Sequence, residues 1–262
     1  MNTAELRETF LTQGLMQPGV MSLHYSSFDR FIFGTAVPTI FPITLETDDA
    51  LKAEHFLQRR EMGVLNVGGN GVITVDGTDY KMERGDMLYI GMGAQQVVFK
   101  SSDRSAPAQY YINSAPAHQA YPTTRMTQSE ANKVELGAQL NANKRTLYQY
   151  IHEGGVQSCQ LVMGFTELSP GNIWNTFPPH THDRRMEVYF YFDVPDDQVV
   201  MHFMGEPTET RHLVMRNFEA VVSPPWSIHA GAGSSAYRFV WGMAGENKAF
   251  ADMDGVPYDT LK

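Results

Sequence analysis

The residues best suited to chemistry lie in the segment PPHTHDRRMEVYFYF and in SPPWSIHAG, about forty residues later. His180 and His182 are two positions apart, so on an extended strand both imidazoles project to the same face. Glu187 follows after four intervening residues, which breaks this alternation and requires a turn or bulge before a strand that begins near Met186. His229, from a later strand, completes three neutral nitrogen donors and one carboxylate. This set suits one divalent transition-metal ion.

The segments that must carry these side chains are short apolar runs separated by Gly and Pro, which is typical of antiparallel β structure. Asp76-Gly77 predicts a hairpin turn, because Gly accepts the positive φ that such turns need. The second half of the chain repeats the plan of the first, and a polar stretch over 114–144 connects them. We therefore expect a mainly β protein with two similar barrels, over residues 1–125 and 126–262.

Helices are expected to be few and short. One is predicted near the N-terminus, where Thr3 can cap and Leu6 and Phe10 share a face before Gly14 stops the helix. We assign this helix to the barrel of residues 1–125. A second short helix is predicted around 129–136.

An internal comparison indicates which barrel binds the metal. GDMLYIGMGAQQ aligns with FEAVVSPPWSIH, which places Gln96 at the position of His229. His55 remains in the first barrel, but Leu57 stands where a second histidine is needed. The first barrel is therefore predicted to be structural and to bind no metal, with His55 as a core or interface residue.

Composition and charge exclude several classes of function. The net charge is −9 and the pI is near 5.4, which excludes the clustered basic surface that nucleic-acid binding requires. No run has the length and apolarity of a membrane span, and Glu5, Arg7 and Glu8 interrupt any signal-like apolar stretch. The single cysteine, Cys159, cannot form an internal disulfide, and we expect it to be a small buried residue. A cytoplasmic protein is predicted.

The pattern HxHx4E with a distant His resembles the metal-binding motifs of the cupin superfamily, whose fold is a small jelly-roll barrel. The resemblance implies a double cupin. Two departures affect loop shape and not the ligands: Gly171 lies farther ahead of His180 than usual, and Trp226 occupies a small-residue position before His229.

The chain also resembles the 5-keto-4-deoxyuronate isomerase family, or 4-deoxy-L-threo-5-hexosulose-uronate ketol-isomerases. Blocks in both halves carry this likeness: FLQRREMGVLNVGGNGVITVDGTDY, YYINSAPAHQAYPT, MGFTELSPGNIWNT, HTHDRRMEVYFYF, MGEPTETRHLVMRN and SPPWSIHAGAG. The resemblance implies conversion of 5-dehydro-4-deoxy-D-glucuronate to 3-deoxy-D-glycero-2,5-hexodiulosonate, a step in the breakdown of pectin and related polymers. It also implies one zinc ion per chain and a hexamer.

A keto-uronate substrate requires a group that moves a proton and a group that binds a carboxylate. For the proton, the alternatives are a metal-bound hydroxide, Tyr189 or Tyr191 on the strand of Glu187, and His118. For the carboxylate, Arg185 shares strand parity with Glu187 and is expected to face the cavity, whereas Arg184 points outward into an ion pair. Arg185 and Tyr189 are therefore the candidate catalytic residues.

Two other classes of function fit the same ligands. A metal-dependent cupin oxygenase can use this set with iron, and a non-catalytic sugar-binding cupin would bind the uronate unchanged. The ligands alone do not separate an isomerase from an oxygenase. The intact ligand set argues against a purely binding role.

Overall fold

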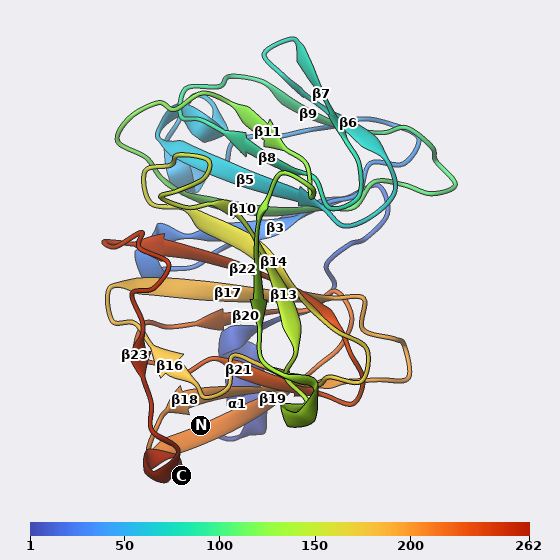
Figure 1. Ribbon diagram of the computed structural model, residues 1–262. Helices are drawn as coiled ribbons and strands as arrows, with labels where there is room; N and C mark the ends of the chain where they lie inside the picture. The colour runs from blue at the N-terminus through green and yellow to red at the C-terminus, as the bar shows by residue number, and fades with distance from the viewer. The chain divides into compact units, whose positions relative to one another are not determined.

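The computed structural model describes residues 1–262, and antiparallel strands dominate it (Figure 1). Burial alternates along Gly71–Val75, where Gly71, Ile73 and Val75 are buried and the two residues between them are partly exposed, so this strand covers a core with one face only. The mainly β fold class predicted from the sequence is confirmed. The chain divides into an N-terminal unit, of residues 15–131 and 150–162, and a C-terminal unit, of residues 1–14, 132–149 and 163–262.

The N-terminal unit is built from two sheets. The six-stranded sheet has the order β11 (Thr124–Met126), β8 (Met87–Ile90), β5 (Arg60–Asn66), β10 (Tyr110–Pro116), β3 (Ile32–Ala36) and β2 (Met21–Tyr25). The four-stranded sheet has the order β4 (Ile43–Thr44), β9 (Val97–Ser101), β6 (Gly71–Val75) and β7 (Thr78–Met82). Apolar side chains from both sheets, including Met62 and Phe99, form one buried core. The predicted hairpin is present between β6 and β7, with both Asp76 and Gly77 at positive φ.

The C-terminal unit has a similar plan. Its seven-stranded sheet has the order β1 (Leu11–Thr12), β20 (Ala220–Ser223), β17 (Arg185–Phe192), β22 (Arg238–Gly245), β14 (Val162–Leu168), β13 (Arg145–Ile151) and β12 (Asn132–Leu136). The second sheet has the order β15 (Trp174–Asn175), β21 (Ala230–Gly233), β18 (Val200–Glu206) and β19 (Glu209–Met215), and β16 (His180–Thr181) pairs with β23 (Asp254–Gly255). The two larger sheets face each other, because Tyr191 of β17 contacts His202 of β18.

The N-terminal helix α1 (Thr3–Phe10) lies in the C-terminal unit. The sequence analysis had assigned it to the N-terminal barrel, so this assignment differs from the structure. Its cap is Asn2, one residue before the predicted Thr3, and the Glu5 side chain completes a capping box. Phe10 contacts Trp226, and β1 adds an edge strand to β20. Periodicity identified the helix and its buried face, but it carries no information about which distant strand that face covers.

The boundary near residue 125 is also different in the structure. Residues 150–162 return to the N-terminal unit, where the buried carboxylate of Glu61 accepts hydrogen bonds from three successive backbone amides, those of Cys159, Gln160 and Leu161, at 2.6–2.8 Å. The hydroxyl of Tyr89 donates to the same carboxylate at 2.8 Å. Cys159 is buried, as expected.

The helix predicted around 129–136 is a strand. Thr127 and Glu130 have the spacing of a capping box, and the Glu130 carboxylate does accept from the backbone N–H and the hydroxyl of Thr127. No helix follows this turn, because Asn132–Leu136 instead pairs as β12 with β13. The remaining helical segments are 3₁₀ turns at Phe28–Arg30, Asp49–Leu51, Phe56–Gln58, Gln139–Asn141 and Tyr258–Thr260.

Candidate metal centre and its pocket

Four side chains converge in the C-terminal unit, and they are the four that the sequence pattern predicts. The ligand atoms of His180, His182, Glu187 and His229 all lie within 4.8 Å of one another. The Nε2 atom of His229 lies 2.9 Å from Glu187 Oε2 and 3.0 Å from His180 Nε2. His182 Nε2 lies 3.1 Å from Glu187 Oε2. Three imidazole nitrogens and one carboxylate oxygen therefore face a common point.

A turn between β16 and β17 brings the ligands together. His180 lies in β16, and the backbone N–H of Arg185 donates to the carbonyl of His182 at 3.3 Å to close the turn that leads into β17. This turn resolves the broken alternation and lets Glu187 point inward from β17, as the sequence predicts. His229 immediately precedes β21, and β20, which leads to it, pairs with β17 so that Ser223 is opposite Glu187.

The hydrogen bonds of the imidazole rings fix which nitrogen faces the centre. His182 Nδ1 lies 2.9 Å from the carbonyl oxygen of Arg185, and a carbonyl oxygen only accepts, so Nδ1 carries the hydrogen. His229 Nδ1 lies 3.3 Å from Ser223 Oγ, which can donate or accept, and 3.4 Å from the carbonyl oxygen of Ser227. In the neutral His182 ring the Nε2 lone pair then points at the Glu187 oxygen, 3.1 Å away. Facing lone pairs repel without a cation between them, and a carbonyl that orients the far nitrogen is usual for metal-bound histidine.

Electrostatics favour a neutral His180 and an ionised Glu187. Burial and the neighbouring His229 lower the pKa of His180 to about 2, so its imidazole is neutral across the physiological range. Burial opposes ionisation of Glu187, but the adjacent imidazoles of His229 and His182 outweigh it and lower the pKa of the carboxyl. Neutral imidazoles beside an ionised carboxylate are the forms that bind a metal ion. The group can hold one divalent ion.

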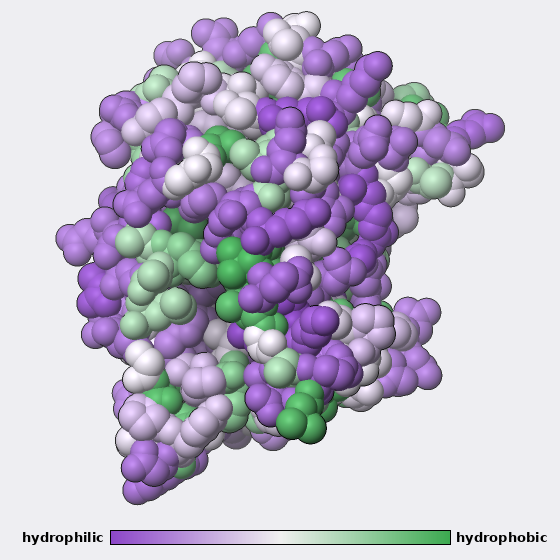
Figure 2. Space-filling view, in the orientation of Figure 1, coloured by the Kyte–Doolittle hydropathy of each residue, from purple (hydrophilic) through white to green (hydrophobic).

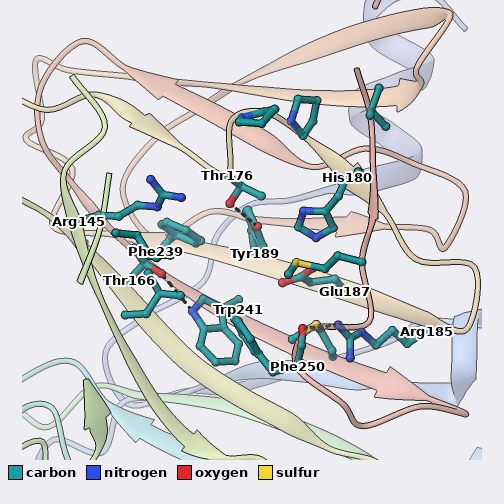
Figure 3. Close-up of a pocket in the computed structure, with 18 of the residues that line it drawn as sticks. Arg145, Thr166, Thr176, His180, Arg185, Glu187, Tyr189, Phe239, Trp241 and Phe250 are labelled. Carbon is teal, nitrogen blue, oxygen red and sulfur yellow. Dashed lines mark hydrogen bonds between the residues drawn. The ribbon is translucent and has the colours of Figure 1, made fainter. Parts of the chain in front are cut away.

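A cavity of about 550 Å³ opens beside this group. In Figure 3, His180 and Glu187 lie on one side of it and Arg145 on the other, with Thr176 and Tyr189 between them. The remaining wall is mostly apolar, and apolar residues gather on the surface between β23 and β13 (Figure 2). The cavity reaches His180 and Glu187 at one end, so a small polar molecule bound in it would contact the metal group there.

Tyr189 lines the cavity from β17, the strand that carries Glu187. Its hydroxyl lies 3.0 Å from Thr176 Oγ1, and burial together with the charge of Glu187 raises the pKa of the phenol well above its usual value. Tyr189 therefore keeps its proton at neutral pH. Tyr191 is directed away from the cavity, with its hydroxyl 2.8 Å from His202 Nδ1, and His118 belongs to the N-terminal unit.

The structure gives Arg185 a different set of partners from the one expected. Its side chain is 1% exposed, and its terminal nitrogens donate to the backbone carbonyls of the segment 247–252. Arg185 points inward, as strand parity predicts, but the segment 247–252 folds over it and accepts from its two terminal nitrogens, while its Nε is buried without a partner. Arg184 forms the expected outward ion pair, with Asp252 and Asp254.

Sequence reasoning did not identify Arg145, Thr166 and Thr176 as residues of the cavity. Each is isolated in the sequence, without a second polar residue at a spacing that indicates a site. Trp174 and Asn175 form β15, and Asn175 is buried with its amide donating to the Tyr237 hydroxyl at 2.6 Å.

Strand register identifies the equivalent positions in the N-terminal unit. Met62 pairs with Ile90 as Glu187 pairs with Ser223, so Met62 corresponds to Glu187. Counting from these residues places His55, Leu57 and Gln96 at the positions of the three ligand histidines. Leu57 and Met62 belong to the apolar core of this unit, and Gln96 is exposed. Of these four residues, only His55 has a side chain that binds metal ions readily.

Sequence comparisons show the family to which the chain is similar. The sequence model of the KduI/IolB family matches residues 16–256. A protein of Formosa agariphila named 4-deoxy-L-threo-5-hexosulose-uronate ketol-isomerase is 59% identical over 253 residues, which cover 97% of this chain and 90% of that protein. A protein of the same name from Lachnoclostridium phytofermentans is 54% identical over 260 residues, 99% of this chain and 94% of that protein.

Solved structures share the fold at low sequence identity. An IolB-like protein from Salmonella typhimurium LT2 superposes with a TM-score of 0.76 at 14% identity, over 95% of this chain and 97% of its own. Bacillus subtilis oxalate decarboxylase, described with Mn(II) centres, gives a TM-score of 0.60 at 9% identity, over 87% of this chain and 71% of its own. None of the helices has the length and apolarity to span a membrane.

Proposed function

The chain belongs to the KduI/IolB family, and from this premise we propose that it is a ketol-isomerase that converts 5-dehydro-4-deoxy-D-glucuronate to 3-deoxy-D-glycero-2,5-hexodiulosonate. The observation that carries the proposal is the convergence of three imidazole nitrogens and one carboxylate at the end of a 550 Å³ cavity. Two relatives named as ketol-isomerases, at 59% and 54% identity, support this activity, and the alignments cover at least 90% of each relative.

The reaction moves a proton between two adjacent carbons of an α-hydroxy carbonyl, and it passes through an enediolate with negative charge on two oxygens. A bound divalent ion supplies a Lewis acid for that charge. His180, His182, Glu187 and His229 are proposed to hold the ion, and the carbonyls of Arg185 and Ser227 orient two of the rings.

Tyr189 is proposed to hold a proton at the substrate. Its hydroxyl is protonated at neutral pH, lies in the cavity wall and already contacts Thr176 Oγ1 at 3.0 Å. A phenol in this state donates a hydrogen bond to a substrate oxygen, and it favours the form in which that oxygen carries more negative charge. Apolar residues around it exclude water from the reacting carbons.

The finer parts of the proposal are the metal, the assembly and the pathway. We propose zinc, which accepts three imidazoles and a carboxylate, in the C-terminal unit only. We propose a hexamer, which the resemblance to the ketol-isomerase family implies. A role in the breakdown of pectin and related polymers and a cytoplasmic location complete the proposal. Elemental analysis and sedimentation velocity test the metal and the assembly.

The deciding experiment follows the keto-uronate by NMR with purified protein of measured metal content. Conversion to the diulosonate, lost on chelation and restored by zinc, is the expected result. Oxygen consumption with this substrate would instead identify an oxygenase, and a bound but chemically unchanged uronate would identify a sugar-binding protein.

A further inference from the structure

The cavity must accommodate a carboxylate if the substrate is a uronate, so this inference rests on the proposed function. The charged side chains that line the cavity are Glu187, Arg185 and Arg145. Glu187 belongs to the metal group. The terminal nitrogens of Arg185 are engaged by the carbonyls of 247–252. Arg145 is then the remaining cation for an anionic ligand.

Arg145 is a half-buried cation without an anionic partner. Its Nη1 donates to the carbonyl of Asn143 at 2.8 Å, and the guanidinium makes no other hydrogen bond or salt bridge. Burial lowers its pKa, although the neighbouring Tyr189 and Tyr237 oppose this effect. An arginine fork has five N–H donors, so most of those of Arg145 have no acceptor within the protein. In a chain of net charge −9, an unpaired guanidinium at this place calls for a separate explanation.

The backbone before Arg145 holds the side chain in position. The N–H of Lys144 donates to Asn172 Oδ1 at 2.8 Å, and Asn172 is fully buried. The N–H of Ala138 donates to Asn143 Oδ1 at 2.9 Å and closes the turn that precedes β13. Arg145 begins β13 and pairs with Leu136, which also lines the cavity. A receptor fixed in this way loses little entropy when it binds.

We propose that Arg145 is the residue that binds the substrate carboxylate. The substrate reacts at the carbons of its aldehyde end, and its carboxylate lies at the other end of a six-carbon chain, about 6 Å away given bonds near 1.5 Å. His180 and Glu187 lie on one side of the cavity and Arg145 on the other, so the two ends of one molecule can face them (Figure 3). Arg145 and the metal group together select acidic open-chain sugars, because a neutral sugar leaves the guanidinium unpaired.

Steady-state kinetics with the keto-uronate test this role first. Arg145→Ala is expected to raise KM about 10- to 100-fold, because it removes a charge-assisted hydrogen-bonded pair, and to change kcat by less. Arg145→Lys keeps the charge without the fork and is expected to recover part of the loss. Arg211→Ala is the matched control: it removes an arginine paired with Glu209 outside the cavity and should leave KM unchanged. A KM within two-fold of wild type in Arg145→Ala, at equal metal content, overturns the proposal.

A binding assay separates this role from the isomerase activity. The far end of the substrate is a 2-keto acid, so 2-oxohexanoate is the probe, and its neutral amide, 2-oxohexanamide, is the control ligand. Calorimetry on metal-free protein should show that wild type prefers the acid, and that Arg145→Ala removes this preference without weakening amide binding. Equal binding of both ligands to wild type, or an equal loss of both in the variant, overturns the proposal. Wild-type protein that prefers the acid but leaves the keto-uronate unconverted would contradict the isomerase function alone.

Discussion

Arg185→Ala is expected to destabilise the C-terminal unit strongly, because this guanidinium is bound to backbone and shielded from water. Its Nη atoms donate to the carbonyls of Ala249 at 2.6 Å, Phe250 at 3.1 Å and Asp252 at 3.2 Å, with a longer contact of 3.4 Å to Asn247. The segment they hold carries Phe250 and Met253, which line the cavity. The substitution therefore releases one wall of the cavity.

The size of the effect follows from these contacts. A hydrogen bond from a charged donor contributes about 1.5–3 kcal/mol, and the half-buried carbonyls of 247–252 recover part of this from water once the side chain is gone. If the net loss equals that of about two such hydrogen bonds, with the void left by the side chain included, the free energy of unfolding falls by about 3–5 kcal/mol. For a chain of this size, such a loss lowers the unfolding midpoint by about 10 °C.

Thermal unfolding of metal-free protein, followed by circular dichroism, measures this effect. Arg184→Ala is the neighbouring control, because it removes the same side chain from an exposed ion pair with Asp252 and Asp254, and a much smaller shift is expected. Limited proteolysis should cut 247–252 faster in Arg185→Ala only. A midpoint within about 2 °C of wild type, combined with a ten-fold higher KM for the keto-uronate, would contradict this reasoning and restore Arg185 as the carboxylate receptor.

Three further predictions concern the metal group and its surroundings. Replacing any one of His180, His182, Glu187 or His229 by Ala should reduce the metal content from one ion per chain, whereas His55→Ala should not; retention of the ion after His229→Ala would contradict the site. Tyr189→Phe should lower kcat about 100-fold at unchanged metal content, and an unaffected kcat would remove Tyr189 from the reaction. Burial and the charge of His229 lower the pKa of His202 to about 3, against 6.5 when unfolded. The unfolded chain then binds the extra proton first, so the stability of metal-free protein should fall as pH drops from about 6.5 to 3, and His202→Gln should flatten this slope in chemical denaturation.

The metal group was predictable from the sequence because its signal is local. Three of the four ligands lie within eight residues, and the parity of an extended strand determines which side chains share a face. The broken parity before Glu187 required a turn, and the structure has one. His229 was identifiable as the distant histidine of the HxHx4E pattern, and the repeated segment showed that the first half has Gln96 at that position.

The partners of the arginines were not predictable in this way. Parity indicated that Arg185 points inward, but its acceptors come from a segment more than sixty residues later, without any periodic pattern. Arg145 has no companion residue at a meaningful spacing, and its role depends on the absence of an anion near it. The place of α1 was missed for a similar reason, because an apolar helix face fits many sheets equally well.

The carboxylate of Glu61 has a consequence for the order in which the chain folds during synthesis. Its amide partners lie 98–100 residues later in the sequence, so at about 5–20 residues per second the ribosome delivers them roughly 5–20 s after Glu61 itself. The helix α1 is made first, yet the strand that β1 joins, β20, is made more than two hundred residues later. The N-terminal unit is therefore complete only after residues 150–162 are made, and α1 is made long before the rest of its own unit. A chain cut between residues 131 and 132 would yield two fragments that are both incomplete.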